Sequence, residues 1–493
     1  MNKNKLGGTF LLQYDALLDP RYQKLLKSLP DSSFEVGGWF EIPQPLVENA
    51  GLKWRGRYPW DWHANVGFST GYSPEEREKL VDVYMKDFKR IFGYYPKSVG
   101  SWFIDAHTLN YMHEKYGIVA SCNCRDQIGT DGYKLWGGYW NQAYYPSKIN
   151  SYMPAQNESN QISVPIFRML GSDPVPQYNA SQKVIRQGNF TMEPAWYFAG
   201  GDSTHVKYYF KMFAEGECME FNYVQVGQEN SFTCAGISKG LELQLPLVAK
   251  LRGEGKLKVE TLAETGKWFR EHYKTTPATS VTVKEDLPGS DCKTVWFDSR
   301  FFRTNLLWEK GTLRFTDVHL FDENFPNDYE KKKETSSQFF FYTLPFIDGY
   351  TATINKIAGL QLKALVIGKK IVLEGKDPVI DDTNKGKLSI TWSLTSVKGN
   401  LIIDIDERQI KLKLESKEPV NWFLDLDAKD NQASFLKTIT LHQVDCQFKE
   451  MLYSVTAIKG NFTQPEKEMI FRITPEKNTL ILDLSRNNQR SLQ

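Results

Sequence analysis

The sequence is poor in cysteine and contains no long apolar run. Six cysteines among 493 residues are too few for the framework of a disulfide-stabilised fold. No apolar stretch reaches the roughly 18 residues that a membrane-spanning helix needs. The formal net charge of +2 gives no electrostatic reason to expect nucleic acid or an anionic membrane as a partner. What remains is a globular chain that is too long for one compact core, so we expect two domains or more.

Several short motifs are also absent. No G-x-G-x-x-G or G-K-[ST] phosphate loop occurs, so no nucleotide cofactor is expected. Ser101 and Ser172 lack a G-x-S-x-G elbow, which argues against a serine esterase. Cys122 and Cys124 have no second cysteine or histidine pair, which favours a buried structural pair over a metal site. Met1–Gly8 lacks the apolar core of a secretory signal, so we expect a cytoplasmic protein, or a periplasmic one if a leader has been removed.

Aromatic residues, by contrast, are abundant: the chain has 13 Trp, 24 Tyr and 30 Phe. Sugar rings have apolar faces that stack on aromatic side chains, so this composition suits a glycan-binding cleft. It suits a large hydrophobic core equally well, and the composition alone leaves both interpretations open.

The first half of the chain alternates short apolar runs with amphipathic segments, the pattern of repeated βα units. The clearest helix is Pro74–Phe92, with Ser73 as N-cap, Glu76 completing a capping box and Gly93 ending it. We predict seven or eight parallel strands in a regular or distorted (β/α) barrel. The predicted strands are Thr9–Asp15, Phe34–Ile42, Ser98–Asp105, Ile118–Cys124, Ser163–Leu170, Met219–Val226 and Leu257–Leu262. The other predicted helices are Pro20–Leu29, Ala106–Tyr116, His205–Ala214, Leu241–Leu251 and Glu264–Tyr273.

After about residue 280 the pattern changes to short β-rich runs separated by Asn, Asp, Gly and Lys. Such runs occur at Leu388–Leu394, Leu401–Ile405, Ile410–Leu414 and Leu480–Leu484. This spacing is typical of a β-sandwich. We therefore predict a barrel domain over residues 1–280 and an all-β accessory domain over residues 281–493, which either binds glycan or completes the cleft of the barrel.

Acidic residues follow nearly every predicted strand, and in parallel barrels the active site lies at the carboxyl ends of the strands. These residues are Asp15, Glu41, Asp105, Asp126, Asp173 and Glu229. Asp105 directly precedes a helix, so an N-cap role and a catalytic role are equally open. Glu229 lies in a loop with no strong helix close by, which favours catalysis. Cleavage of a glycosidic bond needs two carboxyl groups, and we expect Asp105 and Glu229 to supply them, with Glu41 as the reserve.

The residues expected to line the sugar subsites are aromatic or polar and lie near these strand ends. An irregular loop, 124–140, is dense in Asp, Gly and aromatic residues, as binding loops often are. The expected substrate-binding residues are Trp39, Trp62, His63, Trp102, Arg125, Asp126, Asp131 and Trp136.

One stretch resembles a known family. SPEEREKLVDVYMKDFKRIFGYYPKSVGSWFIDAHTLNYMHEKYGIVAS, residues 73–121, resembles the middle of polysaccharide deacetylases of the NodB-homology type. Thr9–Leu12 and Phe34–Gly38 are similar to the two strands that precede it in that family. More broadly, the whole chain is similar to gut-bacterial glycoside hydrolase/deacetylase-like barrel proteins with an appended β domain, which are chiefly domains of unknown function.

The departures from the deacetylase pattern decide what the resemblance implies. Deacetylases have an Asp-Asp pair on the first strand and a paired-His motif on the third. Here no Asp-Asp precedes Thr9, and Trp39 and Glu41 stand where the histidines should be. The resemblance therefore does not support a deacetylase metal site. By similarity to the related seven-stranded barrel glycosidases, Asp105 would be the nucleophile and Glu229 the acid/base.

The sequence thus predicts a glycoside hydrolase that acts on a polysaccharide or oligosaccharide without a bound metal. Two alternatives stay open. One is a metal-dependent carbohydrate deacetylase that uses His63, His107 and a carboxylate. The other is a non-catalytic glycan-binding protein built on a decayed barrel.

Overall fold

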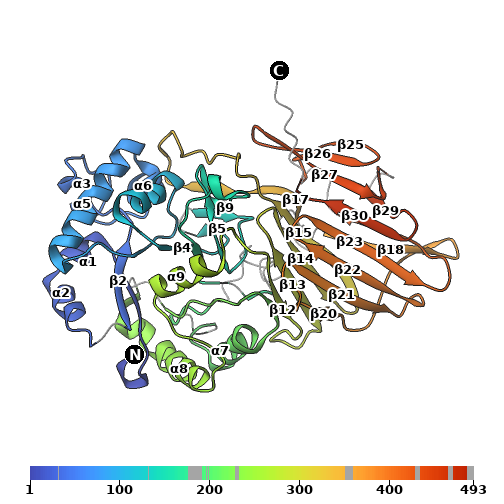
Figure 1. The fold of residues 1–493 in the computed structure, drawn as a ribbon, viewed down its shortest axis with the longest axis horizontal. Helices are drawn as coiled ribbons and strands as arrows, with labels where there is room; N and C mark the ends of the chain where they lie inside the picture. The colour runs from blue at the N-terminus through green and yellow to red at the C-terminus, as the bar shows by residue number, and fades with distance from the viewer. Residues whose placement is uncertain are drawn as a thin grey trace.

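The computed structural model places an α/β part, built from the first half of the chain, beside two large β-sheets built from the second half (Figure 1). The structure describes residues 1–493 except 31–32, 131–132, 172, 176–190, 196, 198, 228–231, 350–358, 428–432, 465–469 and 486–493. Two residues singled out from the sequence, Asp131 and Glu229, lie outside the described residues, as does Ser172.

A parallel sheet forms the centre of the α/β part. Its strand order is β1-β2-β3-β4-β10-β7, in which all neighbours pair in parallel except the edge strand β7. The strands are β1 (Gly8–Leu12), β2 (Phe34–Trp39), β3 (Ser98–Gly100), β4 (Ala120–Cys124), β10 (Ile166–Met169) and β7 (Ala143–Tyr144). Cys122 and Cys124 are both buried in β4. Among the described residues the pairing runs from β1 to β7 without joining these two edges, so the predicted closed barrel is not confirmed.

Two of the predicted strands are wrong. In the segment 219–226, only β11 (Cys218–Met219) is a strand, and it pairs antiparallel with β12 (Thr279–Val283) of the other sheet. Residues 257–261 form no strand, and helix α9 begins at Leu262. Apolar and β-branched composition indicates an extended backbone, but it does not reveal whether a sheet edge is available for pairing.

Helices flank the sheet, and the clearest ones follow the predictions. Helix α5 (Pro74–Phe92) has the expected capping box between Ser73 and Glu76 and ends at Gly93, whose φ is 86°. Helix α6 (Ala106–Tyr116) also has its predicted bounds. The remaining helices are α1 (Tyr14–Leu18), α2 (Pro20–Lys27), α3 (Gln44–Asn49), α4 (Ala64–Gly67), α7 (Ser203–Phe210), a π-helical turn (Lys211–Glu215), α8 (Thr233–Gly253) and α9 (Leu262–His272). In the described part of the chain, no helix combines the length and apolar character needed to cross a bilayer.

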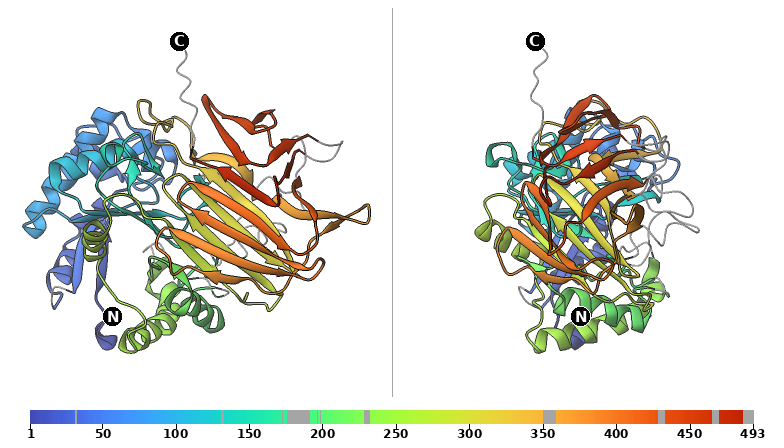
Figure 2. Two further views of the ribbon diagram at one scale, coloured as in Figure 1. Left: turned by 45° about the vertical axis from the view of Figure 1, so that its right-hand side comes forward. Right: turned by 90° about the vertical axis from the view of Figure 1, so that its right-hand side faces the viewer.

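The second half of the chain forms two antiparallel sheets, seen at the right of Figure 1 and in the left view of Figure 2. The first contains β11, β12, β13 (Cys292–Asp298), β14 (Phe302–Glu309), β15 (Thr312–Leu320), β17 (Leu344–Asp348), β18 (Gly359–Val366), β19 (Lys369–Val372), β24 (Asn421–Asp427), β29 (Arg472–Thr474) and β28 (Asn461–Thr463). The second contains β20 (Val379–Asp381), β21 (Lys387–Leu394), β22 (Gly399–Asp406), β23 (Gln409–Ser416), β30 (Thr479–Asp483), β27 (Met451–Lys459), β26 (Gln443–Phe448) and β25 (Leu436–Ile439).

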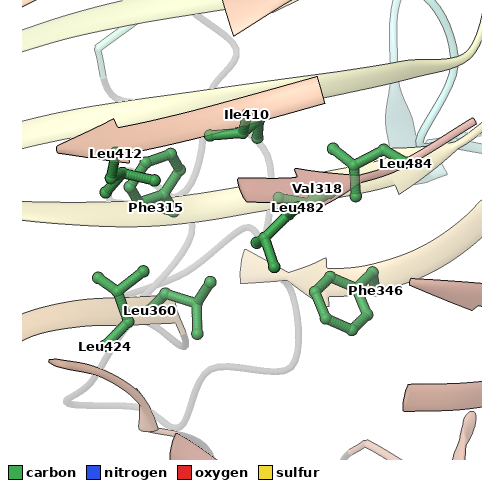
Figure 3. A pocket seen from close by; sticks show the side chains of 9 residues that line it. All are labelled: Phe315, Val318, Phe346, Leu360, Ile410, Leu412, Leu424, Leu482 and Leu484. Atoms are coloured by element: carbon green, nitrogen blue, oxygen red, sulfur yellow. The ribbon is translucent and has the colours of Figure 1, made fainter. Parts of the chain in front are cut away.

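Alternating side chains hold these sheets face to face. In β21 every second residue, from Leu388 to Leu394, is buried, because successive side chains of a strand point to opposite faces. Figure 3 shows side chains of both sheets, among them Phe315 of β15 and Leu412 of β23, around one small apolar space of about 10 Å³. The predicted β-rich runs are thus strands of a sandwich core.

A three-stranded sheet connects the two halves, and a two-stranded sheet lies within the first half. Strand β16 (Phe339–Tyr342) pairs with β6 (Tyr133–Trp136), which forms a hairpin with β5 (Gln127–Thr130). A two-stranded sheet joins β8 (Pro146–Ser147) and β9 (Asn150–Pro154). The β5–β6 hairpin follows directly on the end of β4. Its pairing with β16 therefore brings the second half of the chain to the carboxyl edge of the parallel sheet.

Candidate active site

A small polar cavity lies where β4 and β10 end. Its volume is about 10 Å³, enough for one water molecule. It is lined by Arg125, Asp126, Tyr139, Trp140, Asn141, Arg168 and Gly171. Three of these residues are charged, and two of them, Asp126 and Arg168, are almost completely buried. Because isolated charges are costly to bury, this arrangement needs a dense set of partners.

Asp126 is the centre of that set. Its carboxylate accepts hydrogen bonds from Arg168 at 3.0 Å and from Arg303 at 2.5 Å, as well as from the Tyr152 hydroxyl. The backbone N–H of Gly137 donates to it at 3.0 Å. Although burial opposes ionisation, the Arg303 and Arg168 guanidinium groups hold the pKa of Asp126 below its usual range. Asp126 is therefore a fixed negative charge.

Arg303 and Arg168 also hold the backbone of the loop 137–140, which supplies part of the cavity lining. Arg303 donates to the carbonyl of Gly138 at 2.7 Å, and Arg168 donates to the carbonyl of Tyr139 at 3.0 Å. The next amide, that of Trp140, donates to Asp298 at 2.8 Å. Residues 137–140 are thus held one by one by buried ionisable side chains.

Strands β13 to β15 of the antiparallel sheet supply part of this network. Arg303 lies in β14 and also contacts Asp317 of β15, with nitrogen–oxygen distances of 3.0 and 2.9 Å. His319 contacts Asp317 at 2.9 Å through Nδ1. Asp298, at the end of β13, is fully buried, and burial raises the pKa of its carboxyl group well above the usual value. Strands β13 to β15 therefore supply buried partners to Asp126 and to the loop 137–140.

Asp173 follows β10 and has an unusual environment. It is 5% exposed, and burial raises the pKa of its carboxyl group to about 7. One of its oxygens accepts a hydrogen bond from the Val175 amide at 3.0 Å. The Tyr209 hydroxyl, which donates to the Gly171 carbonyl at 2.8 Å, lies within electrostatic range of both Asp173 and Arg125. Asp173 is therefore two residues along the chain from Gly171, which lines the polar cavity.

Asp105 has a structural environment. It is fully buried and caps α6, accepting from the Thr108 amide at 2.9 Å and the Thr108 hydroxyl at 2.7 Å. The Arg77 guanidinium contacts it at 3.0 Å. Although burial opposes ionisation, Arg77 and Thr108 hold the pKa of Asp105 below its usual value. Of the two roles left open by the sequence, this geometry favours capping.

The other predicted site residues are spread along the same edge. Glu41 is fully buried after β2, while Trp39 and Trp102 are partly buried. Trp136 is 3% exposed, and its indole N–H donates to Asp348 at 3.1 Å, which favours a structural role. Trp62 and His63 lie in the loop before α4.

The histidines proposed for a metal do not share a carboxylate. His63 lies 3.8 Å from Asp61, and His107 contacts Glu78 of α5 at 3.1 Å. In the described part of the chain, no three His, Cys, Asp or Glu side chains come close enough together to hold a metal ion. These residues do not fit the metal site of the deacetylase alternative, and the expected absence of a metal stays a prediction.

Arg168, Arg303 and Asp298 were not identified from the sequence. The available signal was a charged residue inside an apolar run, as in SVPIFRML and FFRTNLLW. Such a residue needs a buried partner, but nothing local indicates which one.

Comparison with known proteins gives a family match for the middle of the chain. Residues 65–293 match the DUF3863 family. This family is described as a domain of unknown function with a solved structure, and the match covers somewhat less than half of the chain. No curated protein matches.

Two solved structures are similar to parts of this chain. One, from Parabacteroides distasonis and provisionally named a glycoside hydrolase/deacetylase, has 17% identity and a TM-score of 0.48 over 71% of this chain and 80% of its own. Another, provisionally named a polysaccharide deacetylase from Mycobacterium smegmatis, has 12% identity and a TM-score of 0.32 over 58% of this chain and 78% of its own.

The DUF3863 region contains Asp105, Asp126, Arg168 and Asp173. Arg303, which completes the environment of Asp126, lies beyond it. The buried network around Asp126 therefore includes residues beyond the matched part of the chain.

Proposed function

We propose that this protein is a carbohydrate-active hydrolase, and more specifically a glycoside hydrolase with Asp173 as its proton donor. The observation that carries the proposal is a buried carboxyl group at the carboxyl edge of a parallel sheet, with a pKa raised to about 7 and two residues along the chain from the lining of a polar cavity. A general acid works best when its pKa lies near the working pH. Burial raises the pKa of glycosidase acids in this way.

The environment separates two kinds of carboxyl group. Asp126 is held ionised by two guanidinium groups, whereas Asp173 has no such neighbour among the causes of its shift. Such a separation is what assigns one group to proton donation and leaves another as a permanent charge. The Asp126 carboxylate accepts hydrogen bonds from Arg168, Arg303, Tyr152 and the Gly137 amide, so it is suited to fixing the loop 137–140 and Arg168 rather than to attacking the substrate.

A second carboxylate is needed as nucleophile or as base for water. Glu193 is 9% exposed and lies within electrostatic range of Arg125, which lines the cavity. We propose Glu193 for this role. Glu229, which the sequence predicted as the acid/base, lies outside the described residues and stays a prediction. Glu41 and Asp105 stay predictions from the sequence, as do the division at residue 280 and the cytoplasmic or periplasmic location.

The test is a digest of plant and host polysaccharides with product analysis by mass spectrometry. New oligosaccharides or monosaccharides support a glycoside hydrolase. Asp173→Asn is then expected to lower kcat by about 10²–10⁴-fold, the usual contribution of a general acid. Asp286→Asn is the matched control, because Asp286 is another buried carboxylate within electrostatic range of Asp173, and it accepts hydrogen bonds from Ser290 and from the Cys292 amide at the start of β13.

Other outcomes contradict the proposal in different ways. Loss of acetyl groups with the sugar chain intact would identify a deacetylase. Binding without any product would identify a glycan-binding protein. If Asp173→Asn retains full activity while product is formed, the protein is a hydrolase but Asp173 is not its acid.

A further inference from the structure

The loop 53–63, which joins α3 to α4, is built around a buried carboxylate. Asp61 is 1% exposed and accepts three hydrogen bonds from Arg57, one from the amide at 2.9 Å and two from the guanidinium group at 2.9 Å each. The His63 amide donates to it at 3.2 Å. The Arg57 hydrogen bonds hold the pKa of Asp61 well below its usual range. One buried carboxylate thus holds both ends of the seven-residue segment from Arg57 to His63.

This rigid segment presents aromatic rings to solvent. Tyr58 is 57% exposed and Trp62 is 42% exposed, although large aromatic side chains are usually more buried than this. The Arg57 guanidinium lies 4.9 Å from the Trp62 ring centroid and 5.6 Å from that of Tyr58. Arg57 therefore supports one face of Trp62, and the exposed area leaves room for a ligand on the rest of the ring.

The loop lies at the carboxyl edge of the parallel sheet, where the polar cavity also lies. The Trp62 carbonyl accepts a hydrogen bond from the Tyr133 hydroxyl at 3.3 Å. Tyr133 belongs to β6, whose last residue, Trp136, directly precedes Gly137, and Gly137 donates to Asp126. The β5–β6 hairpin thus connects the exposed rings to the residues around the cavity.

We propose that Trp62 and Tyr58 form a stacking platform for the sugar rings of a glycan chain, at the same carboxyl edge of the sheet as the polar cavity. The platform rests on the proposed function for the class of its ligand. Sugar rings stack their apolar faces on indole and phenol rings, and neighbouring polar groups bind their hydroxyls. Arg57 and the 31%-exposed side chain of His63 are the polar groups beside the rings. Holding the loop by Asp61 lowers the entropy lost when a ligand orders it.

A glycan fits this surface better than a protein partner does. A stable protein interface buries roughly 800 Å² on each partner and has a continuous apolar centre. Here the exposed rings are only two, and charged or polar residues, such as Arg57 and His63, stand between and beside them. A single sugar chain needs no larger surface than this.

The test measures binding without turnover. The full-length protein is run on native gels that contain mixed-linkage β-glucan, xylan, arabinan, glycogen or chondroitin sulfate. At least one of these polysaccharides is expected to retard the wild-type protein. Trp62→Ala is expected to weaken the apparent affinity about tenfold or more, and Trp62→Phe, which keeps a ring, to retain most of it. Equal thermal unfolding of the variants shows that the loop mutation does not unfold the protein.

Tyr94→Ala is the matched control. Tyr94 is 46% exposed and lies between α5 and the start of β3, which is the amino edge of the same sheet. Its removal is expected to leave binding unchanged. Absence of retardation in every gel, or equal loss of affinity in Tyr94→Ala and Trp62→Ala, overturns the platform.

The platform and the hydrolase proposal fail separately. Binding that depends on Trp62 without any product contradicts only the hydrolase. Product formation with polysaccharide affinity unchanged in Trp62→Ala contradicts only the platform. A third outcome also overturns the platform. If Trp62→Ala is retarded on the gels as strongly as wild type, and a protein partner is captured that requires Trp62, the surface binds protein instead.

Discussion

Arg303 of β14 and Asp126, which follows β4, form a fully buried ion pair at 2.5 Å although 177 residues separate them in the chain. Arg303 also binds Asp317 and the carbonyl of Gly138. The pair therefore ties the sandwich to the carboxyl edge of the parallel sheet. Strand β14 of the first antiparallel sheet therefore contributes to the surroundings of the candidate site. Whether the second half of the chain binds glycan or completes the cleft, the two roles that the sequence left open, stays a prediction.

Replacing Arg303 by Gln is expected to destabilise the protein strongly. It leaves Asp126 and Asp317 buried with less compensation, and breaking a buried ion pair costs about 3–5 kcal/mol. The measurement is the midpoint of denaturant unfolding. Arg90→Gln is the control: Arg90 pairs with Asp87 at 2.9 Å on the surface of α5, where such a pair is worth about 1 kcal/mol or less. Equal effects of the two changes would contradict a central role for Arg303.

Replacing Gly137 by Ala is expected to disturb the same network from the backbone side. The φ angle of Gly137 is 84°, and an added Cβ would lie 2.2 Å from Thr343 Oγ1 and 2.6 Å from the His319 ring. Gly117→Ala is the control, since Gly117 has a φ of 73° and open space around the added atom. We expect Gly137→Ala to lower the unfolding midpoint clearly more than Gly117→Ala, because only the former adds a clash to the cost of the backbone conformation.

Replacing Asp105 by Asn separates capping from catalysis. Asn caps helices about as well as Asp, so the main loss is the charge that compensates the buried Arg77. We expect a fall in stability of a few kcal/mol, about 3 or more, with kcat per folded molecule nearly unchanged. The measurements are thermal unfolding and activity on whichever glycan the digest identifies. A selective loss of kcat at unchanged stability would restore Asp105 as a catalytic residue.

The raised pKa of Asp173 predicts a pH dependence of stability. Its folded-state pKa of about 7 lies above the unfolded value of 3.8, so the folded protein binds more protons between these pH values. The contribution of this group to stability therefore falls as the pH rises from about 4 to 7. Asp173→Asn is expected to unfold at a higher temperature than wild type at pH 8, by roughly 2 °C or more, and at about the same temperature at pH 4.

The same pKa predicts that kcat depends on pH. If Asp173 donates the proton, kcat falls as the pH rises through about 7, because the acid form is lost. Asp377→Asn, at an exposed carboxylate that pairs with Lys293 at 3.0 Å, should leave both profiles unchanged. An unfolding temperature of Asp173→Asn that runs parallel to wild type from pH 4 to pH 8 would contradict the raised pKa.

The sequence by itself determined the local elements. The capping box of Ser73 and Glu76 and the left-handed stop at Gly93 fixed the bounds of α5, because caps depend on residues within one turn. Alternation fixed the sandwich strands in the same way, since the buried positions of β21 are every second residue. The sequence also indicated that acidic residues follow nearly every predicted strand, and Asp173 is one of these residues.

The tertiary structure decided which residues meet. Met219–Val226 reads as a strand, but its partner edge is elsewhere, so only its first residue pairs. Asp105 and Asp126 look alike in sequence. In the structure, however, Asp105 caps helix α6, whereas Asp126 forms ion pairs with two arginines from distant strands. Burial likewise gives Asp173 its raised pKa, and burial depends on every element packed around the residue. Local hydrogen bonding and periodicity are encoded along the chain, whereas charge compensation and desolvation arise only when remote segments come together.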